Sequence, residues 1–331
     1  MATIAAVGAA SAQTAVYGIV DVAVQKVTGS DGGIVSGGYS GSRLGVKGST
    51  DLGGGLKGNY MMETGLNAAD GNTATYLGNR GASAGVSGAF GSISLGRQFT
   101  PFAVSLFNEP LEYDGFSTLY GGSVQADHVW QSNSVLYTSP SMGGLTISAM
   151  YSGTSGSSGN KTLATKAAAD GTLGFVSIET KPLAGTYMAV GGNYVMGPLT
   201  IDAAYESSKV TEVSVSEKFV ITPAGTTTTG WHLSGLYNAG FATLYGAVQG
   251  GDNGTDKQSA WDIGAGVPLG DGLALQAGYY SVKVANTNSY TSAVLVKDWN
   301  KQTRIYGGAV MSAVSGSADS TTVKAGLRYS F

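Results

Sequence analysis

The sequence lacks cysteine altogether and is poor in charged residues. Among its 331 residues there is no cysteine, and only 12% are Asp, Glu, Lys or Arg. The absence of cysteine excludes a disulfide scaffold and thiolate metal sites. The charged fraction is about half the roughly 25% of ordinary globular proteins, which argues against a disordered chain solvated by its charge. With a net charge of −3 and 18 scattered Lys and Arg residues, we expect no nucleic-acid partner.

Long hydrophobic runs are also missing. No stretch of about 18 residues has the Leu, Ile and Phe density of a membrane-spanning helix. The uncharged start of the chain is mostly Ala, Gly, Ser and Thr, and Ala10-Ser11-Ala12 followed by Gln13 matches a small-residue signal-peptidase site. Since no basic segment precedes this site, we interpret residues 1–12 as the remnant of an export signal. The alternative is an ordinary frayed N-terminus.

What the sequence has in abundance is glycine and a two-residue alternation. It contains 53 Gly and 18 Tyr, without the Gly-X-Y repeat of collagen. In residues 323–331, Val, Ala, Leu, Tyr and Phe fall on one face, while Lys, Gly, Arg and Ser fall on the other. The segment 56–63 likewise places Lys57, Asn59 and Glu63 together. Because no long stretch shows a 3.6-residue period, we predict an all-β protein.

Turn signals divide the chain into about sixteen strands. Short, mostly glycine-rich connections occur at 51–55, 88–91, 141–144, 196–198, 238–240, 269–272 and 299–302. Longer polar segments lie at 28–40, 67–78, 152–172, 207–229 and 250–258. The strands are predicted to begin near residues 15, 41, 55, 79, 92, 133, 145, 186, 199, 229, 241, 259, 273, 289, 303 and 321. Short turns at one edge and long loops at the other are typical of an up-and-down antiparallel barrel, and sixteen strands enclose an aqueous lumen.

The longest early insert, at 101–132, follows the fifth predicted strand. Inserts of this length inside a compact domain are usually functional. We therefore expect this segment to carry part of the function.

The apolar strand faces fit a lipid environment better than a soluble sandwich. A sandwich would turn these faces inward, and the remaining faces carry too little charge for a surface exposed to water. In a membrane barrel the apolar side chains face lipid and the polar ones face the lumen, and every backbone polar group must be paired, so the sheet closes. We therefore expect the last strand, which ends at Phe331, to pair with the first and to place its terminal aromatic ring at the lipid interface.

Four stretches of the sequence carry a family resemblance. They are residues 17–21 (YGIVD), 41–48 (GSRLGVKG) with 51–53 (DLG), 90–98 (FGSISLGRQ), and 133–137 (NSVLY) with 139–140 (SP). On these residues the chain resembles the trimeric Gram-negative outer-membrane general porin family, in the branch that includes anion-preferring porins. Residues 326–331 are similar to the family's C-terminal insertion signal, which implies recognition by the barrel-assembly machinery through the strand ending at Phe331.

The resemblance implies a homotrimer of 16-stranded antiparallel transmembrane β-barrels, with residues 13–331 as a single porin domain. It also implies that the third loop, 101–132, folds into the barrel and narrows it, with acidic loop residues facing a basic ladder on the wall. The residues that carry over are Arg43, Arg80 and Arg97 on the wall and Glu109, Glu112 and Asp114 on the loop.

Alternation adds two residues to this set and bears on a third. It puts Lys47 on the same face as Arg43, and it puts Glu63 inward on the third strand. Strict alternation would place Arg97 on the lipid face. A bulge at Gly96 would turn Arg97 inward, and the high cost of an unpaired arginine in lipid favours that arrangement.

The sequence departs from the family pattern at three places. Residues 128–132 lack the arginine that usually precedes Asn133-Ser134, Thr50 replaces a common glutamate, and residues 107–115 differ from the usual loop tip. One wall charge fewer weakens the expected anion preference. We expect weak charge selectivity, under roughly tenfold, because the Debye length of about 10 Å at 0.1 M salt is comparable to a pore radius.

These observations predict a passive diffusion channel for small hydrophilic solutes and ions in the outer membrane, reached through the periplasm. Outer-membrane lipids and lipopolysaccharide would surround it, and we expect no cofactor, no metal and no enzymatic activity. A substrate-specific outer-membrane channel is the alternative. A barrel enzyme is less favoured, since His232 is the only histidine in a predicted strand and nothing pairs it with His128 into a metal site. An adhesin or soluble sandwich is the remaining alternative.

Overall fold

The computed structural model describes residues 13–72, 76–108, 116, 129–155, 162–167, 173–178, 183–212, 225–284 and 286–331. The expected export-signal remnant at 1–12 lies outside these residues. Within the described ranges, no helix is long and apolar enough to cross a membrane.

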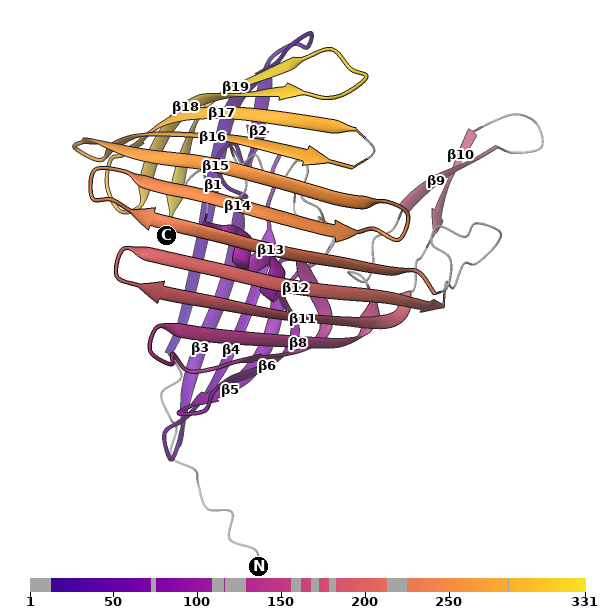
Figure 1. Cartoon of the computed structure of the whole chain (residues 1–331), viewed down its shortest axis with the longest axis vertical. Helices are drawn as coiled ribbons and strands as arrows, with labels where there is room; N and C mark the ends of the chain where they lie inside the picture. Colours follow the sequence, from indigo (N-terminus) through magenta and orange to yellow (C-terminus); the bar gives the residue numbers. More distant parts are fainter. Residues whose placement is uncertain are drawn as a thin grey trace, which may run out of the picture.

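The strands form one closed antiparallel barrel (Figure 1). In the part of the chain that the structure describes, sixteen strands make up its wall: β1 (Gln13–Val27), β3 (Arg43–Gly53), β4 (Leu56–Gly65), β5 (Gly81–Gly88), β6 (Gly91–Phe99), β7 (Trp130–Thr138), β8 (Leu145–Ser155), β11 (Leu183–Met196), β12 (Leu199–Glu212), β13 (Thr227–Asn238), β14 (Thr243–Asp252), β15 (Lys257–Gly270), β16 (Leu273–Lys283), β17 (Thr287–Asp298), β18 (Thr303–Ala313) and β19 (Ser320–Ser330). All begin within three residues of their predicted positions, the largest differences being at Trp130 and Leu183. The predicted all-β, sixteen-stranded fold is confirmed.

Three further strands lie in or next to segments predicted as loops. β2 (Gly33–Ser36) pairs with the second half of β1. β9 (Thr162–Ala167) and β10 (Leu173–Ile178) form a separate two-stranded sheet that projects beyond the long-loop rim of the barrel (Figure 1). These runs are short and sit among polar residues, so alternation over four to six positions is too weak a signal to detect them.

The barrel closes through β1, which has partners along both edges. One edge pairs with β19, from Ile19 opposite Ser330 to Val27 opposite Thr322. The other edge pairs with β3 near the start of β1 and with β2 further along. Phe331 continues the pairing, because its backbone N–H donates to the Gly18 carbonyl at 3.1 Å and its own carbonyl accepts from the Gly18 N–H at 3.0 Å. The predicted pairing of the last strand with the first is therefore present.

Side chains alternate between lipid and lumen along the strands. On β14, Tyr245 and Gln249 are buried in the interior, while Leu244 and Val248, each directly before one of them, are exposed on the outer surface. The outer surface carries large apolar side chains on strands all around the wall, and Asp, Glu, His and Gln occur among the buried residues. This distribution is the inverse of a water-soluble protein and matches a membrane barrel with a polar interior.

The third loop begins with a helical turn inside the barrel. α1 (Pro101–Ser105) has Pro at its start, and the Thr100 hydroxyl caps it by accepting from the Ala103 N–H at 3.0 Å. η1 (Leu106–Asn108) follows directly. Phe102 and Leu106 pack in one buried cluster with Ala204 of β12.

Phe116, further along the same loop, is fully buried in a cluster with residues of β1, β17 and β18. Those strands lie across the barrel from β12, against which the first turn of the loop packs. The loop thus reaches two separated parts of the inner wall, and its predicted inward course is confirmed for the described residues.

Candidate functional site

Two predicted wall arginines converge on one carboxylate. Arg43 opens β3, Glu63 lies near the end of β4, and Arg80 directly precedes β5. The Arg80 Nε atom is 2.8 Å from Glu63 Oε1, and the Arg43 Nε atom is 3.9 Å from Glu63 Oε2. The Arg80 N–H also donates to the Glu63 backbone carbonyl at 3.2 Å, which ties the loop to the strand. The structure therefore brings these three predicted residues together.

Lys47 joins the same group through Tyr17 of β1. The Lys47 ammonium lies 4.9 Å from the centre of the Tyr17 ring, and the Tyr17 hydroxyl donates to Glu63 Oε2 at 3.1 Å. The strand register explains the meeting, because Tyr17 is opposite Gly45 and Gly45 is opposite Glu63. A Cβ on Gly45 would lie 2.3 Å from the Tyr17 ring, so the absent side chain makes room for the tyrosine.

Arg97 is held by neutral groups. Its Nε atom donates to the Asn79 carbonyl at 2.7 Å and its Nη1 atom donates to the Ser132 hydroxyl at 2.8 Å. The β6–β7 ladder shifts register between Gly96 and Gln98, and Gly96 has a φ of 128°. The irregularity predicted at Gly96 is therefore present.

The predicted acidic partners on the loop, Glu109, Glu112 and Asp114, lie outside the described residues. Their position relative to the basic wall stays a prediction.

A second group of cations on the wall was missed by sequence reasoning. Arg304 of β18 and Lys324 and Arg328 of β19 face the lumen, in a row continuous with buried Asp21 of β1: Arg304 is opposite Arg328, and Arg328 is opposite Asp21. The alternation on β19 already puts Lys324 and Arg328 on one polar face, so this signal was available. The cross-strand register with β18 was not readable from local pattern.

Asp21 fixes a segment of the first loop inside the barrel. It accepts hydrogen bonds from the Tyr306 hydroxyl at 2.5 Å and from the Ser40 N–H at 2.9 Å. Tyr39, directly before Ser40, is fully buried, and its hydroxyl donates to Gln276 Oε1 at 2.9 Å. Its ring lies 6.0 Å from that of Phe116, so the first and third loops meet in the lumen.

Acidic groups occupy the opposite wall. Asp202 and Glu206 of β12 and Asp262 of β15 are buried on the inner face. Asp202 accepts from the Asn193 amide at 2.8 Å, and Glu206 accepts from the Tyr187 hydroxyl at 2.7 Å. Strand order puts β12 and β15 across the barrel from β3 and β4. Sequence reasoning did not single out these acids, although Asp202 and Glu206 lie four residues apart on one face of β12.

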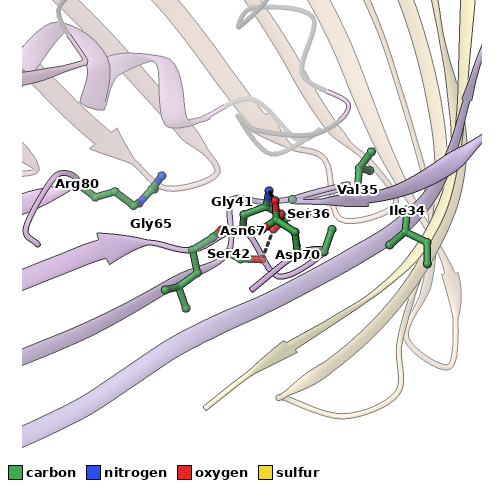
Figure 2. Close-up of a pocket in the computed structure, with 12 residues that line it drawn as sticks. Ile34, Val35, Ser36, Gly41, Ser42, Gly65, Asn67, Asp70 and Arg80 are labelled. Atoms are coloured by element: carbon green, nitrogen blue, oxygen red, sulfur yellow. Dashed lines mark hydrogen bonds between the residues drawn. The ribbon is translucent and has the colours of Figure 1, made fainter. Parts of the chain in front are cut away.

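A recess of about 710 Å³ opens beside Arg80 between β2 and the loops around 37–42 and 65–70. Figure 2 shows Arg80 at one end of this recess and Ile34 and Val35 at the other. Asp70 and Asn67 also line it, so its wall is mixed in polarity. The recess places the basic group next to the long-loop side of the barrel.

Comparison with known proteins shows the family to which this barrel belongs. The Gram-negative porin family matches the chain over residues 1–331, and the chain belongs to that family. Outer membrane porin protein 32 of Delftia acidovorans is 27% identical over 382 aligned positions, covering 100% of this chain and 98% of the relative. An outer membrane porin protein of Bordetella pertussis is 27% identical over 80% of this chain and 71% of its own length.

Solved structures agree on the fold. An anion-selective porin from Comamonas acidovorans superposes with a TM-score of 0.74 at 23% identity, covering 97% of this chain and 100% of that one. A loop-deletion mutant of OmpT from Vibrio cholerae gives a TM-score of 0.71 at 17% identity, with coverage of 97% and 99%. The chain is an outer-membrane porin, and porins are diffusion channels rather than enzymes.

Proposed function

We propose that residues 13–331 form one porin domain that passes small hydrophilic solutes and ions with weak charge selectivity, and that residues 101–132 form its constriction loop. The observation that carries the proposal is the convergence of Arg43 and Arg80 on Glu63, across the barrel from Asp202 and Glu206. Arg97 and Lys47 extend the basic side, and Glu109, Glu112 and Asp114 on the loop would add to the acidic side.

The charges would act through a field across the lumen. Arginine stays protonated at any working pH, so the basic side is permanent. Anions would then move along the β3–β5 side and cations along the loop side, as charged rings in channels direct ions. Large apolar solutes would be excluded, because they would displace ordered water held between the two sides.

The selectivity should favour anions and stay small. The resemblance to a structure named as an anion-selective porin supports the sign. Glu63 within the basic group offsets part of its charge, and two charges 4 Å apart in water interact by only about 1 kcal/mol. We therefore expect an anion-to-cation permeability ratio under roughly tenfold at about 0.1 M salt.

The reversal potential across a planar bilayer with a salt gradient tests this proposal on the purified, refolded chain. A ratio of tenfold or more, or a preference for cations, would contradict it. Saturable block of the current by one class of solute would instead favour a substrate-specific channel.

We also propose that the protein works as a homotrimer surrounded by outer-membrane lipids and lipopolysaccharide, and that the assembly machinery recognises the strand ending at Phe331. The exposed apolar side chains of β1, β3 and β4, including Val16, Leu44 and Met62, offer a surface for neighbouring copies or lipid. One related Vibrio cholerae structure is described as a trimer form. Conductance steps in multiples of three would support the trimer, and single independent steps would contradict it.

A further inference from the structure

A second polar recess lies at the short-turn edge of the barrel, next to the first-loop residue Tyr39, whose ring packs against Phe116. It has a volume of about 320 Å³ and is bounded by the ends of β17, β18 and β19 and the turn between the first two. Among the residues that line it are three cations, Lys301, Arg304 and Arg328, and one carboxylate, Asp298. The recess therefore has a formal charge of +2 before any ligand binds.

The strand register brings these charges to one place. Asp298 is opposite Arg304, Arg304 is opposite Arg328, and Arg328 is opposite Asp21. Because Asp21 is fully buried inside the barrel, the whole row faces the lumen. The recess is therefore on the path of solutes and not on the lipid surface.

Arg304 and the turn that carries Lys301 are held in position before a ligand arrives. Arg304 donates to both carboxylate oxygens of Asp298, at 2.6 Å and 2.9 Å, and its guanidinium lies 5.0 Å from the centre of the Tyr39 ring. The Asn300 side chain accepts the N–H groups of Gln302 and Thr303, each at 2.8 Å, and so fixes the turn that carries Lys301. Asp298 orients Arg304 and offsets one positive charge, so the charged groups that line the recess keep a joint excess of two positive charges.

We propose that this recess binds small oxyanions of charge two, of the phosphate class, as they pass the short-turn mouth. Guanidinium groups match the oxygen geometry of phosphate, and a lysine adds a mobile point charge. The recess is large enough for a small ion with part of its hydration shell. Tyr39 contacts both Arg304 and Phe116, so the site lies on the short-turn side of the loop contact in the lumen.

This placement makes the channel unequal in its two directions. A dianion arriving from the short-turn side meets the recess before the narrow part of the lumen, and a dianion arriving from the long-loop side meets it last. Inorganic phosphate should therefore reduce the chloride current more strongly from one side of the membrane than from the other. The inference rests on the proposed conducting pore but not on the charge preference of its constriction.

Inorganic phosphate added to each side in turn of a planar bilayer tests the site, at about pH 8, where phosphate is a dianion. We expect phosphate to block the current at an at least about threefold lower added concentration from one side than from the other, and nitrate, a monoanion at equal ionic strength, to show no such difference. Lys301→Gln and Arg328→Gln should each weaken the stronger block by about three- to tenfold.

Lys297→Gln is the matched control, because it removes a lysine from the same edge that does not line the recess. It should leave the unequal block in place. Lys301 is exposed in a turn, so its variant stays informative even if Arg328→Gln in the last strand reduces folding. Equal block from both sides, or unchanged block in Lys301→Gln, would overturn the inference. A refolded chain that conducts no ions would instead overturn the proposed function.

Discussion

At the scale of single residues, Glu63 controls how much charge the basic wall presents. Its two carboxylate oxygens form ion pairs with Arg80 and Arg43 and accept a hydrogen bond from the Tyr17 hydroxyl. Only 9% of the surface of Glu63 is exposed, so water screens its charge only partly. The basic wall therefore keeps a positive excess that Glu63 reduces by one charge, and it is not a row of independent arginines.

Glu63→Gln should shift the reversal potential toward anions, raising the anion-to-cation ratio by about two- to threefold, because one negative charge leaves the lumen while the arginines remain. Arg80→Gln should shift it in the opposite direction. Asp51→Asn, an equal change of charge at an exposed residue near the end of β3, is the control and should change the ratio little. A shift of Glu63→Gln toward cations would contradict the role given to this wall.

His232 poses a different residue-scale question. It is 2% exposed, and neither ring nitrogen has a hydrogen-bond partner among the described residues, although Phe102 packs against the ring at 6.2 Å. A buried polar group without a partner costs about 1–3 kcal/mol. His232→Phe should therefore raise the free energy of unfolding by about 1 kcal/mol, measured by urea titration in detergent.

His232→Asn, which keeps a polar group, should not stabilise the protein. Ion conductance should be unaffected by either substitution, since the ring is covered by α1. A loss of stability in His232→Phe would show that the imidazole has a bonding role.

At the scale of elements, the third loop is anchored at two separated positions on the wall. α1 packs against β12 through Phe102 and Leu106, and Phe116 packs in the cluster that includes Tyr39 and Tyr306. Tyr306 meets Phe116 edge to face at 6.0 Å, an arrangement favoured for aromatic pairs. A loop fastened at both places has little freedom to change the width of the lumen.

Phe116→Ala should release the second anchor. The variant removes a fully buried ring, a change that costs about 3–5 kcal/mol in packed cores. We expect larger single-channel conductance and more current noise, measured in a planar bilayer. Phe107→Ala, which removes a 39% exposed ring from the same loop, should change both less. Unchanged conductance and noise in Phe116→Ala would mean that the remaining contacts hold the loop alone.

The irregularity in β6 depends on one glycine. Gly96 has a φ of 128°, and a Cβ there would lie 2.2 Å from the Ala82 backbone carbonyl. Gly96→Ala should therefore lower the free energy of unfolding of the barrel by about 2 kcal/mol or more and reduce the refolding yield. Gly235→Ala is the control, because its added methyl group meets nothing within 4 Å. The mobility of unheated samples in a denaturing gel distinguishes folded from unfolded chain.

The sequence was sufficient for features that depend on local alternation. The wall strands, the irregularity at Gly96 and the inward faces of Arg43, Lys47 and Glu63 follow from period two and turn chemistry, and the pairing of β1 with β19 follows from the need to close the sheet in lipid. Features that depend on contacts between distant strands were not accessible. Arg304 meets Arg328 through a register that no local pattern specifies, and Tyr39 enters the lumen because Asp21 binds its loop.

At the scale of the whole molecule, charge is divided across the lumen. Cations face inward on β18, β19, β3 and the segment before β5, and the buried acids Asp202 and Glu206 lie on β12, on the other side of the barrel. Asp262 on β15 lies between the two sides, three strands from β18. Three acids, Asp21, Glu63 and Asp298, also lie within the cationic side, where they pair with neighbouring residues. The division is therefore a bias between two sides, and salt should weaken it.

We expect the charge selectivity to fall as the salt concentration rises. The Debye length shortens from about 10 Å at 0.1 M to about 3 Å at 1 M, so most of the lumen then lies beyond the reach of the wall charges. The anion-to-cation ratio from reversal potentials should approach unity at the higher concentration. A ratio independent of salt would point to selection by direct contact with partly dehydrated ions.

The closure of the barrel through β1 has a consequence for how the protein is made. Thr28 and Thr321 hydrogen-bond to each other across 293 positions of the chain. The pairing of β1 with β19 therefore cannot form until the last strand has been synthesised and exported. Contacts between such distant residues form slowly, and strands with unpaired edges aggregate readily. Such a chain needs a chaperone that keeps it unfolded and prevents aggregation during export. The slowest step of its folding should be the pairing of β1 with β19.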